Sequence, residues 1–350
     1  MKKVLISRAG GYEELQLVER PTVEPGRDEV RIRVEAIGVN YADCVVRMGL
    51  YESARTYVGW PITPGFEVAG TIEALGEDVE DLELDQAVLA VTRFGGYSSE
   101  LVVHRAQIFD RPRGWSVAEA AGLPSVALTA WYALSKLAHP EAGERVLVHS
   151  AAGGVGGSLV QQARIAGARV VGVVGAAHKL ETVRQLGAER VIDKSLEDLE
   201  SALAREYPGG FDVICDANGA STLQQSYDHL APGGRLVVYG FHSMLPREGG
   251  RPSWLKLGWD YLRTPRFNPL RMTSENRSVL AFNLSFLFHR HDVLGRAMAE
   301  ILRWAEEGSL TPAPVREYPL SRVADAHRDL ESGQTVGKLV LRPDPDDGHA

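Results

Sequence analysis

A glycine-rich turn between a strand and a helix constrains the fold of this chain more than any other feature of its sequence. The segment RVLVHSAAGGVGG runs from Arg145 to Gly157 and puts four glycines into five residues, after a β-branched apolar run. Ala151, Gly153 and Gly156 occupy the three positions of a G-x-G-x-x-G fingerprint, with alanine at the first. In such a turn the middle glycine lets the backbone approach a pyrophosphate, and the last lets the helix pack on its strand.

The segments after this turn alternate between short apolar runs and amphipathic stretches. ARVVGVV, RVID, FDVICDA and RLVVYG are β-branched runs of strand length, and each stretch between them is polar on one face. Such alternation predicts a doubly wound parallel sheet with helices on both faces. The helix after the glycine turn then directs its N-terminal N–H groups at an anion, so we predict dinucleotide binding by Gly153, Gly154, Val155 and Gly156.

The first third of the chain has the rhythm of strands instead. In EVRIRVEAIGVN, the residues Val30, Ile32 and Val34 alternate with charged residues, which is the period-two pattern of a half-buried strand. The strand-like runs EVAGTIEAL, QAVLAV and YSSELVVH follow, with glycine-rich turns between them. The expected fold class is therefore α/β, with a β-rich domain joined to a Rossmann domain whose parallel sheet is doubly wound.

Composition and charge narrow the class of function. A net charge of −8 over 350 residues argues against nucleic acid as a partner. The two cysteines, Cys44 and Cys215, are too few for a disulfide framework, and no apolar run reaches the ~18 residues of a membrane span. Because no secretory signal follows the first lysines, the expected location is the cytoplasm.

The residues after the second strand of the alternating region indicate which dinucleotide is bound. An NAD site usually has an acid about 20 residues after the fingerprint, which binds the ribose 2′-hydroxyl. Here the strand runs into VVGAAHK without an acid, Lys179 follows, and Lys194 comes after the third strand. Two cations suit a 2′-phosphate, so NADPH is the expected cofactor; the alternative is that both lysines are solvated surface residues.

The run GERVLVHSAAGGVGGSLVQQAR, from Gly143 to Arg164, resembles the signature of the zinc-independent quinone oxidoreductases, the zeta-crystallin group of the medium-chain dehydrogenase/reductase superfamily. GVNYADCVVRMGLY, TPGFEVAGTI, LTAWYAL and TVGKLVL resemble other segments of that family, and its vesicle amine transport protein branch is the most similar. The resemblance implies a GroES-like catalytic domain at 1–122 and 311–350. It also implies a Rossmann NADPH-binding domain at 123–310 with an insertion at 242–275, a cofactor in the cleft, and a homodimer.

The resemblance implies site residues as well. Zinc-using relatives carry cysteine at the position of Asn40 and histidine at the position of Phe66, so no metal is expected. Carried over by position, Asn40 and Tyr51 are the catalytic candidates, and the further cofactor contacts fall on Asn40, Thr129, Asn218, Tyr239, Gly240, Phe282 and Lys338. A packing role is the alternative for these residues, and for Tyr51 it is a tyrosine at the domain rim.

Without a metal to polarise it, the substrate has to accept hydride readily. A quinone or another α,β-unsaturated carbonyl does so because the added charge delocalises onto oxygen, which Tyr51 or Asn40 then stabilises by donating a hydrogen bond. The expected activity is NADPH-dependent reduction of a small hydrophobic quinone or enone. The alternatives are an enoyl-thioester reductase, and an NADPH-binding protein that acts at membranes or on lipids with little turnover.

Two late segments lie outside the core of such an enzyme. Between Leu245 and Met272, basic residues are mixed with tryptophan, tyrosine and leucine. This mixture suits peripheral contact with an anionic membrane or a lid over a hydrophobic substrate, and the alternative is packing on its own domain. The run VLAFNLSFLF, from Val279 to Phe288, predicts an edge strand with Leu280, Phe282, Leu284 and Phe286 on one face, which can pair with a second copy.

Overall fold

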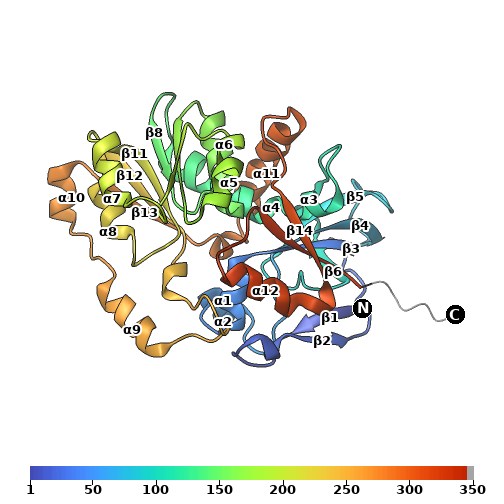
Figure 1. Ribbon diagram of the computed structural model, residues 1–350. Helices are drawn as coiled ribbons and strands as arrows, with labels where there is room; N and C mark the ends of the chain where they lie inside the picture. Colours follow the sequence, from blue (N-terminus) through green and yellow to red (C-terminus); the bar gives the residue numbers. More distant parts are fainter. Residues whose placement is uncertain (345–350) are drawn as a thin grey trace. The chain divides into compact units, whose positions relative to one another are not determined.

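A computed structural model describes residues 1–344, which divide into two compact units (Figure 1). Unit 1 comprises Met1–Ser125, Arg247–Arg251 and the residues from Ser285 onward, and unit 2 comprises Val126–Pro246 and Pro252–Leu284. The domain bounds expected from the sequence remain a prediction, and residues 345–350 of that prediction lie outside the described part of the chain. The expected Rossmann domain at 123–310 includes α11 (His291–Glu306), whereas α11 groups with unit 1 and not with the residues of the parallel sheet.

Unit 2 is built on a parallel sheet of six strands in the order β10–β9–β8–β11–β12–β13. The strands are β8 (Arg145–Val148), β9 (Arg169–Val174), β10 (Arg190–Asp193), β11 (Phe211–Asp216), β12 (Leu230–Val238) and β13 (Ser278–Ala281). Counted from β8, this is the order 3-2-1-4-5-6 of a Rossmann fold, which confirms the expected fold class. The order reverses between β8 and β11, and sheets of this kind bind ligands at the carboxyl ends of the strands there.

Helices cover both faces of this sheet, as expected. They are α4 (Pro124–Trp131), which continues as a π-helical stretch over Tyr132–Ala138, then α5 (Gly154–Ile165), α6 (Leu180–Gln185), α7 (Leu199–Glu206), α8 (Leu223–Asp228) and α10 (Pro269–Glu275). The remaining helix of unit 2, α9 (Trp254–Arg263), has no buried residue and does not cover the sheet. Val146 and Val148 of β8 pack with Leu159 of α5 on one face. Leu147, which points the other way, packs with Leu203 of α7 and with α8 on the opposite face.

The last strand of this sheet is shorter than the sequence suggested. β13 pairs with β12 from Ser278 to Ala281, Phe282 adds one N–H···O=C bond to Val238, and Leu284–Leu287 form a 3-10 turn. The predicted strand from Val279 to Phe288 is therefore wrong beyond Ala281. The physical reason is that β12 ends at Val238, so the following residues have no ladder partner there.

Unit 1 is β-rich, with a seven-stranded sheet in the order β14–β15–β3–β4–β5–β7 and β6 paired with β3. Its strands are β1 (Lys2–Leu5), β2 (Gln16–Glu19), β3 (Glu29–Val39), β4 (Glu67–Leu75), β5 (Ala87–Val91), β6 (Glu100–His104), β7 (Ile108–Asp110), β14 (Val315–Pro319) and β15 (Lys338–Arg342). Its other helices are α1 (Tyr41–Arg47), α2 (Glu52–Tyr57), α3 (Val117–Ala121) and α12 (Val323–Glu331). The last described strand, β15, pairs with β3 from the first part of the chain.

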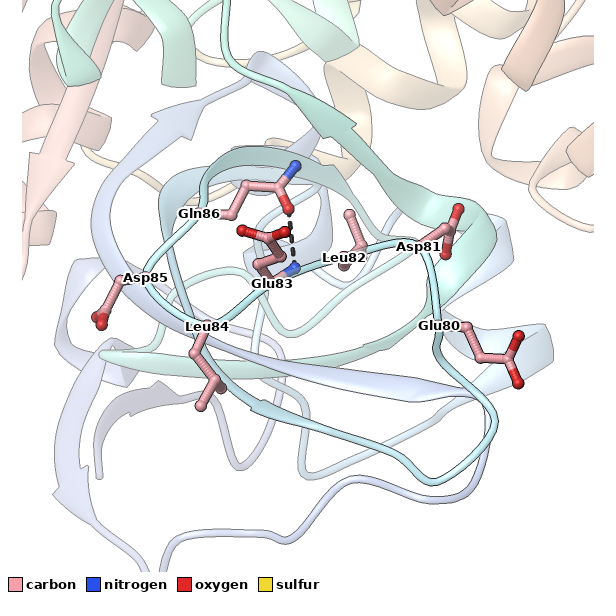
Figure 2. A pocket seen from close by; sticks show the side chains of 7 residues that line it. All are labelled: Glu80, Asp81, Leu82, Glu83, Leu84, Asp85 and Gln86. Atoms are coloured by element: carbon pink, nitrogen blue, oxygen red, sulfur yellow. Dashed lines mark hydrogen bonds between the residues drawn. The ribbon is translucent and has the colours of Figure 1, made fainter.

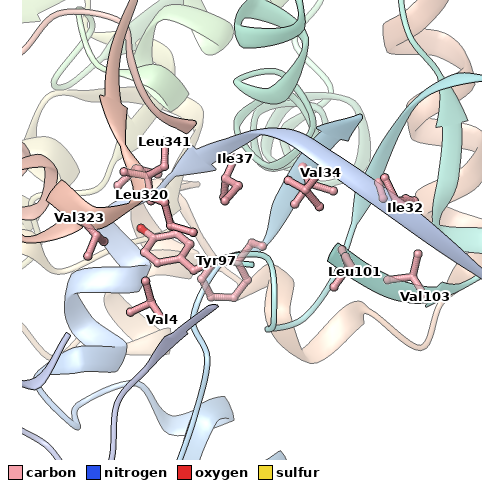
Figure 3. Packing of buried hydrophobic residues seen from close by; sticks show 14 of the residues in the cluster. Val4, Ile32, Val34, Ile37, Tyr97, Leu101, Val103, Leu320, Val323 and Leu341 are labelled. Atoms are coloured by element: carbon pink, nitrogen blue, oxygen red, sulfur yellow. The ribbon is translucent and has the colours of Figure 1, made fainter. Parts of the chain in front are cut away.

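The core of unit 1 follows the alternation read from the sequence. Ile32 and Val34 of β3 are buried in one cluster with Tyr97, Leu101 and Leu341 (Figure 3). Arg33, which lies between them in the sequence, is exposed. This burial supplies most of the stability of such a sheet, since each fully buried aliphatic side chain contributes roughly 1.5–3 kcal/mol. Across residues 1–344, no helix has both the length and the apolar content that crossing a bilayer requires.

Candidate functional site

The glycine turn of unit 2 has the geometry that its sequence predicted. Gly153 is the N-cap of α5, Gly154 and Val155 form its first turn, and Ser150 holds a positive φ of 53°. A Cβ at Gly156 would overlap the carbonyl oxygen of Ser150, whereas a Cβ at Gly153 would meet that oxygen only at 3.5 Å. The fold thus requires glycine at 156 and not at 153, which leaves space for a ligand at the N-terminus of the helix.

A buried carboxylate organises the loop after β11. Asp216 accepts hydrogen bonds from the backbone N–H groups of Asn218, at 2.7 Å, and Gly219, at 3.2 Å, and from two hydroxyls. The Ser150 hydroxyl donates to Asn218 Oδ1 over 3.1 Å, which joins this loop to the glycine turn. Asn218 Nδ2 is buried and has no hydrogen-bond partner within residues 1–344. Because buried donors are normally paired, this N–H₂ group fits an acceptor atom of a ligand such as a nucleotide.

Predicted aromatic and glycine positions gather at the ends of the neighbouring strands. Phe282 lies 4.9 Å, between ring centroids, from Tyr132 and 6.5 Å from Tyr239. The Tyr239 N–H donates to the backbone carbonyl of Asp216, and a Cβ at Gly240 would lie 3.0 Å from the carbonyl oxygen of Ala217, directly after β11. Tyr132 lies in the segment LTAWYAL, from which the sequence reasoning selected only Thr129.

The two lysines follow the carboxyl ends of β9 and β10. Lys179 ends a 3-10 turn and is only 9% exposed, so the alternative that it is a solvated surface residue is wrong. Lys194 is exposed, and its Cε lies 3.6 Å from where a Cβ of Gly175 would be, beside the end of β9. Thr129 lies half-buried on α4 and takes no part in the contacts described above.

In unit 1, Asn40 and Lys338 are brought together by a residue that the sequence reasoning missed. Glu67, at the start of β4, accepts a hydrogen bond from Asn40 Nδ2 at 2.8 Å and forms an ion pair with Lys338 Nζ at 2.7 Å. Lys338 also donates to Asn40 Oδ1 over 2.6 Å. The available signal was an acid directly before the apolar residues Val68 and Ala69 of an expected strand, since a carboxylate in a buried strand requires partners.

Tyr51 belongs to an aromatic cluster. Its ring makes edge contacts with Phe66, at 5.8 Å between centroids, and Phe94, at 6.5 Å, and Phe66 itself is buried. Phe66 directly precedes Glu67, the first residue of β4, so this aromatic cluster lies next to the residue that binds Asn40. Tyr51 is also the N-cap residue of α2, and the partly buried ring has both a packing contact and a polar end.

One buried group in the described chain has the composition of a metal site. Ligand atoms of Cys44, His327 and Glu331 lie within 4.8 Å of one another. However, the carboxylate of Glu331 already accepts hydrogen bonds from the Arg47 guanidinium and the Tyr12 hydroxyl, at 2.7 Å for the latter. Burial also raises the pKa of the Cys44 thiol well above its usual value. A fixed cation and a neutral thiol both oppose metal binding, so we assign no metal here.

A shallow hollow of about 630 Å³ lies over the acidic loop between β4 and β5 (Figure 2). Seven consecutive residues, Glu80 to Gln86, line it, and Asp81 is bound by Arg105 at 2.7 Å. Gln86 Oε1 accepts the Glu83 N–H at 3.0 Å. None of the predicted site residues lies in this loop, and its carboxylates face solvent or arginine, so it is not part of the candidate site.

Known proteins resemble this chain over almost its full length. Residues 26–127 match the family described as alcohol dehydrogenase GroES-like domain, and residues 186–341 match the family described as zinc-binding dehydrogenase. The rat synaptic vesicle membrane protein VAT-1 homolog is 31% identical over 99% of this chain and 85% of its own length. A 2-haloacrylate reductase from Burkholderia is 30% identical over 97% of this chain and 98% of its own. The Escherichia coli quinone oxidoreductase crystallised with NADPH superposes with a TM-score of 0.84 at 28% identity, covering 98% of this chain and 100% of that one.

Proposed function

This chain belongs to the medium-chain dehydrogenase/reductase superfamily, in the branch of quinone oxidoreductases and VAT-1 homologues, and we propose that it reduces quinones or other α,β-unsaturated carbonyls with NADPH. Membership of this branch makes it an NAD(P)H-dependent oxidoreductase. One observation carries the proposal. The uncrowded Gly153 and the unpartnered Asn218 Nδ2 lie in two loops joined by the Ser150–Asn218 hydrogen bond, where the strand order reverses. That is where a Rossmann sheet receives a dinucleotide.

The proposed binding residues have distinct tasks in unit 2. The N–H groups at the start of α5 receive the pyrophosphate, because Gly153 lets the backbone approach closely. Lys179 and Lys194 bind the 2′-phosphate, and Asn218 Nδ2 donates to an oxygen of the cofactor. The bound cofactor supplies a hydride to the substrate.

Asn40 and Tyr51 are the proposed catalytic residues in unit 1. When hydride adds to a conjugated carbonyl or quinone, the electron pair of the broken π bond moves onto oxygen, and a proton from solvent completes the reduction. An N–H of Asn40 or the hydroxyl of Tyr51 stabilises that oxygen by hydrogen bonding. The apolar ring of Phe66 beside Tyr51 suits a hydrophobic substrate.

We propose that this chemistry proceeds without zinc. The position at which zinc-using relatives have a cysteine is Asn40, and its Oδ1 lies 2.6 Å from the Lys338 ammonium. Phe66, which offers no ligand atom, stands where those relatives have a histidine. A fixed positive charge beside an amide opposes a divalent cation. Elemental analysis of the purified protein and activity after dialysis against a chelator test this point.

The test of the main proposal is loss of NADPH absorbance with a panel of quinones, enones and a crotonyl thioester, with NADH run in parallel. We expect turnover with quinones or enones, and a preference for NADPH of at least about tenfold, which two lysine–phosphate contacts supply. Fast turnover of the thioester alone would instead establish the enoyl-thioester reductase. Tight NADPH binding without turnover of any compound would contradict the oxidoreductase proposal.

The exposed face of α9 favours a second candidate function, contact with an anionic membrane. Trp254, Leu255, Trp259 and Leu262 are between 61% and 90% exposed, and none of the residues of α9 is buried. α9 therefore does not bury its apolar face on its own unit, although Phe267 and Met272, later in the same insertion, pack against the core of unit 2. In Figure 1 α9 stands apart from the β8–β13 sheet of its own unit.

The polar side of α9 is the side that makes contacts within unit 2. Lys256 donates to the Ser243 carbonyl and pairs with Asp260, so the usual orientation of an amphipathic surface helix is reversed. Arg263, whose guanidinium lies 6.0 Å from the Trp259 ring, adds positive charge at the edge of the apolar face. Apolar rings bordered by arginine suit the headgroup region of a bilayer with anionic lipids.

Liposome flotation tests this second proposal. Vesicles of phosphatidylcholine with phosphatidylserine should carry the protein, and phosphatidylcholine alone should carry about fivefold less. The double exchange Trp254→Ser and Trp259→Ser should abolish flotation, whereas Leu196→Ser, at a 75% exposed leucine elsewhere, should not change it. Equal flotation of all three proteins would contradict the assignment, as would a change in oligomeric state without lipid binding.

A homodimer in the cytoplasm remains part of the proposal. β13 is the edge strand of the unit 2 sheet, so its free edge can pair with a second copy. A monomeric mass by light scattering at micromolar concentration would contradict the dimer.

A further inference from the structure

The carboxamide of Asn40 is bound on both of its polar atoms by groups of opposite charge. Nδ2 donates to Glu67 Oε1 over 2.8 Å, and Oδ1 accepts from Lys338 Nζ over 2.6 Å. An ammonium group can only donate, and a carboxylate can only accept. A reversed amide would place N–H₂ against the ammonium and oxygen against the carboxylate, so these two partners fix which way the amide points.

The two charged partners are themselves held in a fitted space. The side chains of Lys338 and Glu67 are 3% and 0% exposed, and the second oxygen of Glu67 accepts the Ser125 N–H at 2.6 Å. A Cβ at Gly38 would overlap the Glu67 carboxylate, and a Cβ at Gly122 would lie 2.9 Å from the Lys338 side chain. Glycine at both positions therefore makes room for the pair, and a buried pair that is fully hydrogen-bonded is rigid.

After these contacts, Asn40 retains one N–H of Nδ2, and its side chain is only half-buried. From this geometry we infer that Glu67 and Lys338 are positioning residues, which hold Asn40 so that its remaining N–H is presented to the substrate oxygen. The inference rests on the proposed function for the role of that N–H. It reassigns Lys338 from cofactor contact to the orientation of a catalytic amide.

A double-mutant cycle tests whether the pair acts through Asn40. The combined exchange Lys338→Met and Glu67→Gln removes both charges and leaves no unpaired ion in the interior. The introduced glutamine keeps an oxygen for the Ser125 N–H and offers an N–H to Asn40, so the amide of Asn40 should turn around. We expect kcat to fall about tenfold or more, while the Kd for NADPH stays within about twofold.

The same combined exchange is then made in an Asn40→Ala background. If the pair acts through Asn40, it should change kcat by less than about twofold there. An equal fall in kcat with and without Asn40 would overturn the inference, as would a change confined to the Kd for NADPH. Far-UV circular dichroism and the melting temperature confirm that each variant is folded.

A measurement without substrate separates this inference from the proposed function. In protein labelled with ¹⁵N-asparagine, the Asn40 side-chain resonances are those lost in Asn40→Ala. We expect two well-separated N–H signals that exchange slowly with water in the wild type, and a large shift in the combined variant. Signals like those of exposed asparagines in the wild type would overturn the inference, even if the enzyme were active. A wild type that reduces no compound would overturn the proposed function and leave the NMR result to decide the orientation.

Discussion

The exchange His327→Gln tests how burial of a histidine in unit 1 makes the free energy of unfolding depend on pH. His327 lies on α12 and is fully buried, and its Nε2 is 3.1 Å from the Tyr97 hydroxyl, which donates to Asp43. While Asp43 is ionised, the one hydroxyl hydrogen of Tyr97 is used on Asp43, so Nε2 carries the ring proton and donates to Tyr97. Nδ1 has no hydrogen-bond partner in the part of the chain that the structure describes.

The expected effect follows from the pKa of this ring. Protonation of Nδ1 would bury a cation without an acceptor, and burial, reinforced by the Arg47 guanidinium, lowers the pKa of His327 from 6.5 to about 3. The stability that this neutral ring contributes is complete above about pH 6.5 and is lost as the pH falls, because the unfolded chain then binds a proton that the native state excludes. Each pH unit corresponds to about 1.4 kcal/mol, so from about pH 7 to about pH 5 the native state loses about 2 kcal/mol.

The wild type and the His327→Gln variant share the other ionisable groups near this position, which are Asp43, Cys44, Arg47, Tyr97 and Glu331. Burial raises the pKa of Asp43 to about 7. Protonation of that carboxyl therefore stabilises the native state as the pH falls from about 7 to about 4, which opposes the effect of His327. The wild type alone can show a flat profile, and only the difference between the two proteins isolates His327.

The assay is urea unfolding of wild type and His327→Gln at about pH 7 and about pH 5, followed by fluorescence and circular dichroism. The difference in free energy of unfolding between the wild type and His327→Gln should be about 2 kcal/mol smaller at the lower pH. The reason is that only in the wild type does unfolding release a histidine that then binds a proton. His289→Gln, at an exposed histidine, controls for loss of an imidazole. A cost that stays the same within about 0.5 kcal/mol at both pH values would refute the reasoning.

The remaining predictions concern the candidate site. Gly156→Ala should lower the melting temperature by several degrees, because its Cβ overlaps a backbone oxygen. Gly153→Ala should leave the melting temperature unchanged and raise the Kd for NADPH about tenfold. If both variants changed the melting temperature and the Kd equally, the separate roles of the two glycines would be contradicted. Tyr51→Phe should lower kcat/KM about tenfold if its hydroxyl donates to the substrate, and an unchanged value would show that the ring only packs. Lys179→Met and Lys194→Met should each reduce the ratio of kcat/KM with NADPH to kcat/KM with NADH about tenfold, as measured by steady-state kinetics. An unchanged ratio in both variants would show that neither lysine contacts the 2′-phosphate.

Local patterns in the sequence were sufficient for the fold class. The alternation of Val30, Ile32 and Val34 marks which face of a strand is buried, and the glycine turn after Val148 marks the first strand and helix of the parallel sheet. Such patterns are readable because burial imposes a period of two on strands and about 3.6 on helices. Gly156 was also predictable, since a tight turn between strand and helix leaves no room for a side chain.

The candidate site was predictable only as a set of positions. That Asn40 is bound by Lys338, 298 residues away, and that Glu67 joins them, depends on how β15 and β4 pair with β3. The end of β13 was set by the length of its neighbour β12, and the outward turn of the apolar face of α9 by the contacts of Lys256. Sequence periodicity says which residues are buried, but partners across strands come from the tertiary packing, because a period carries no information about which distant segment lies opposite.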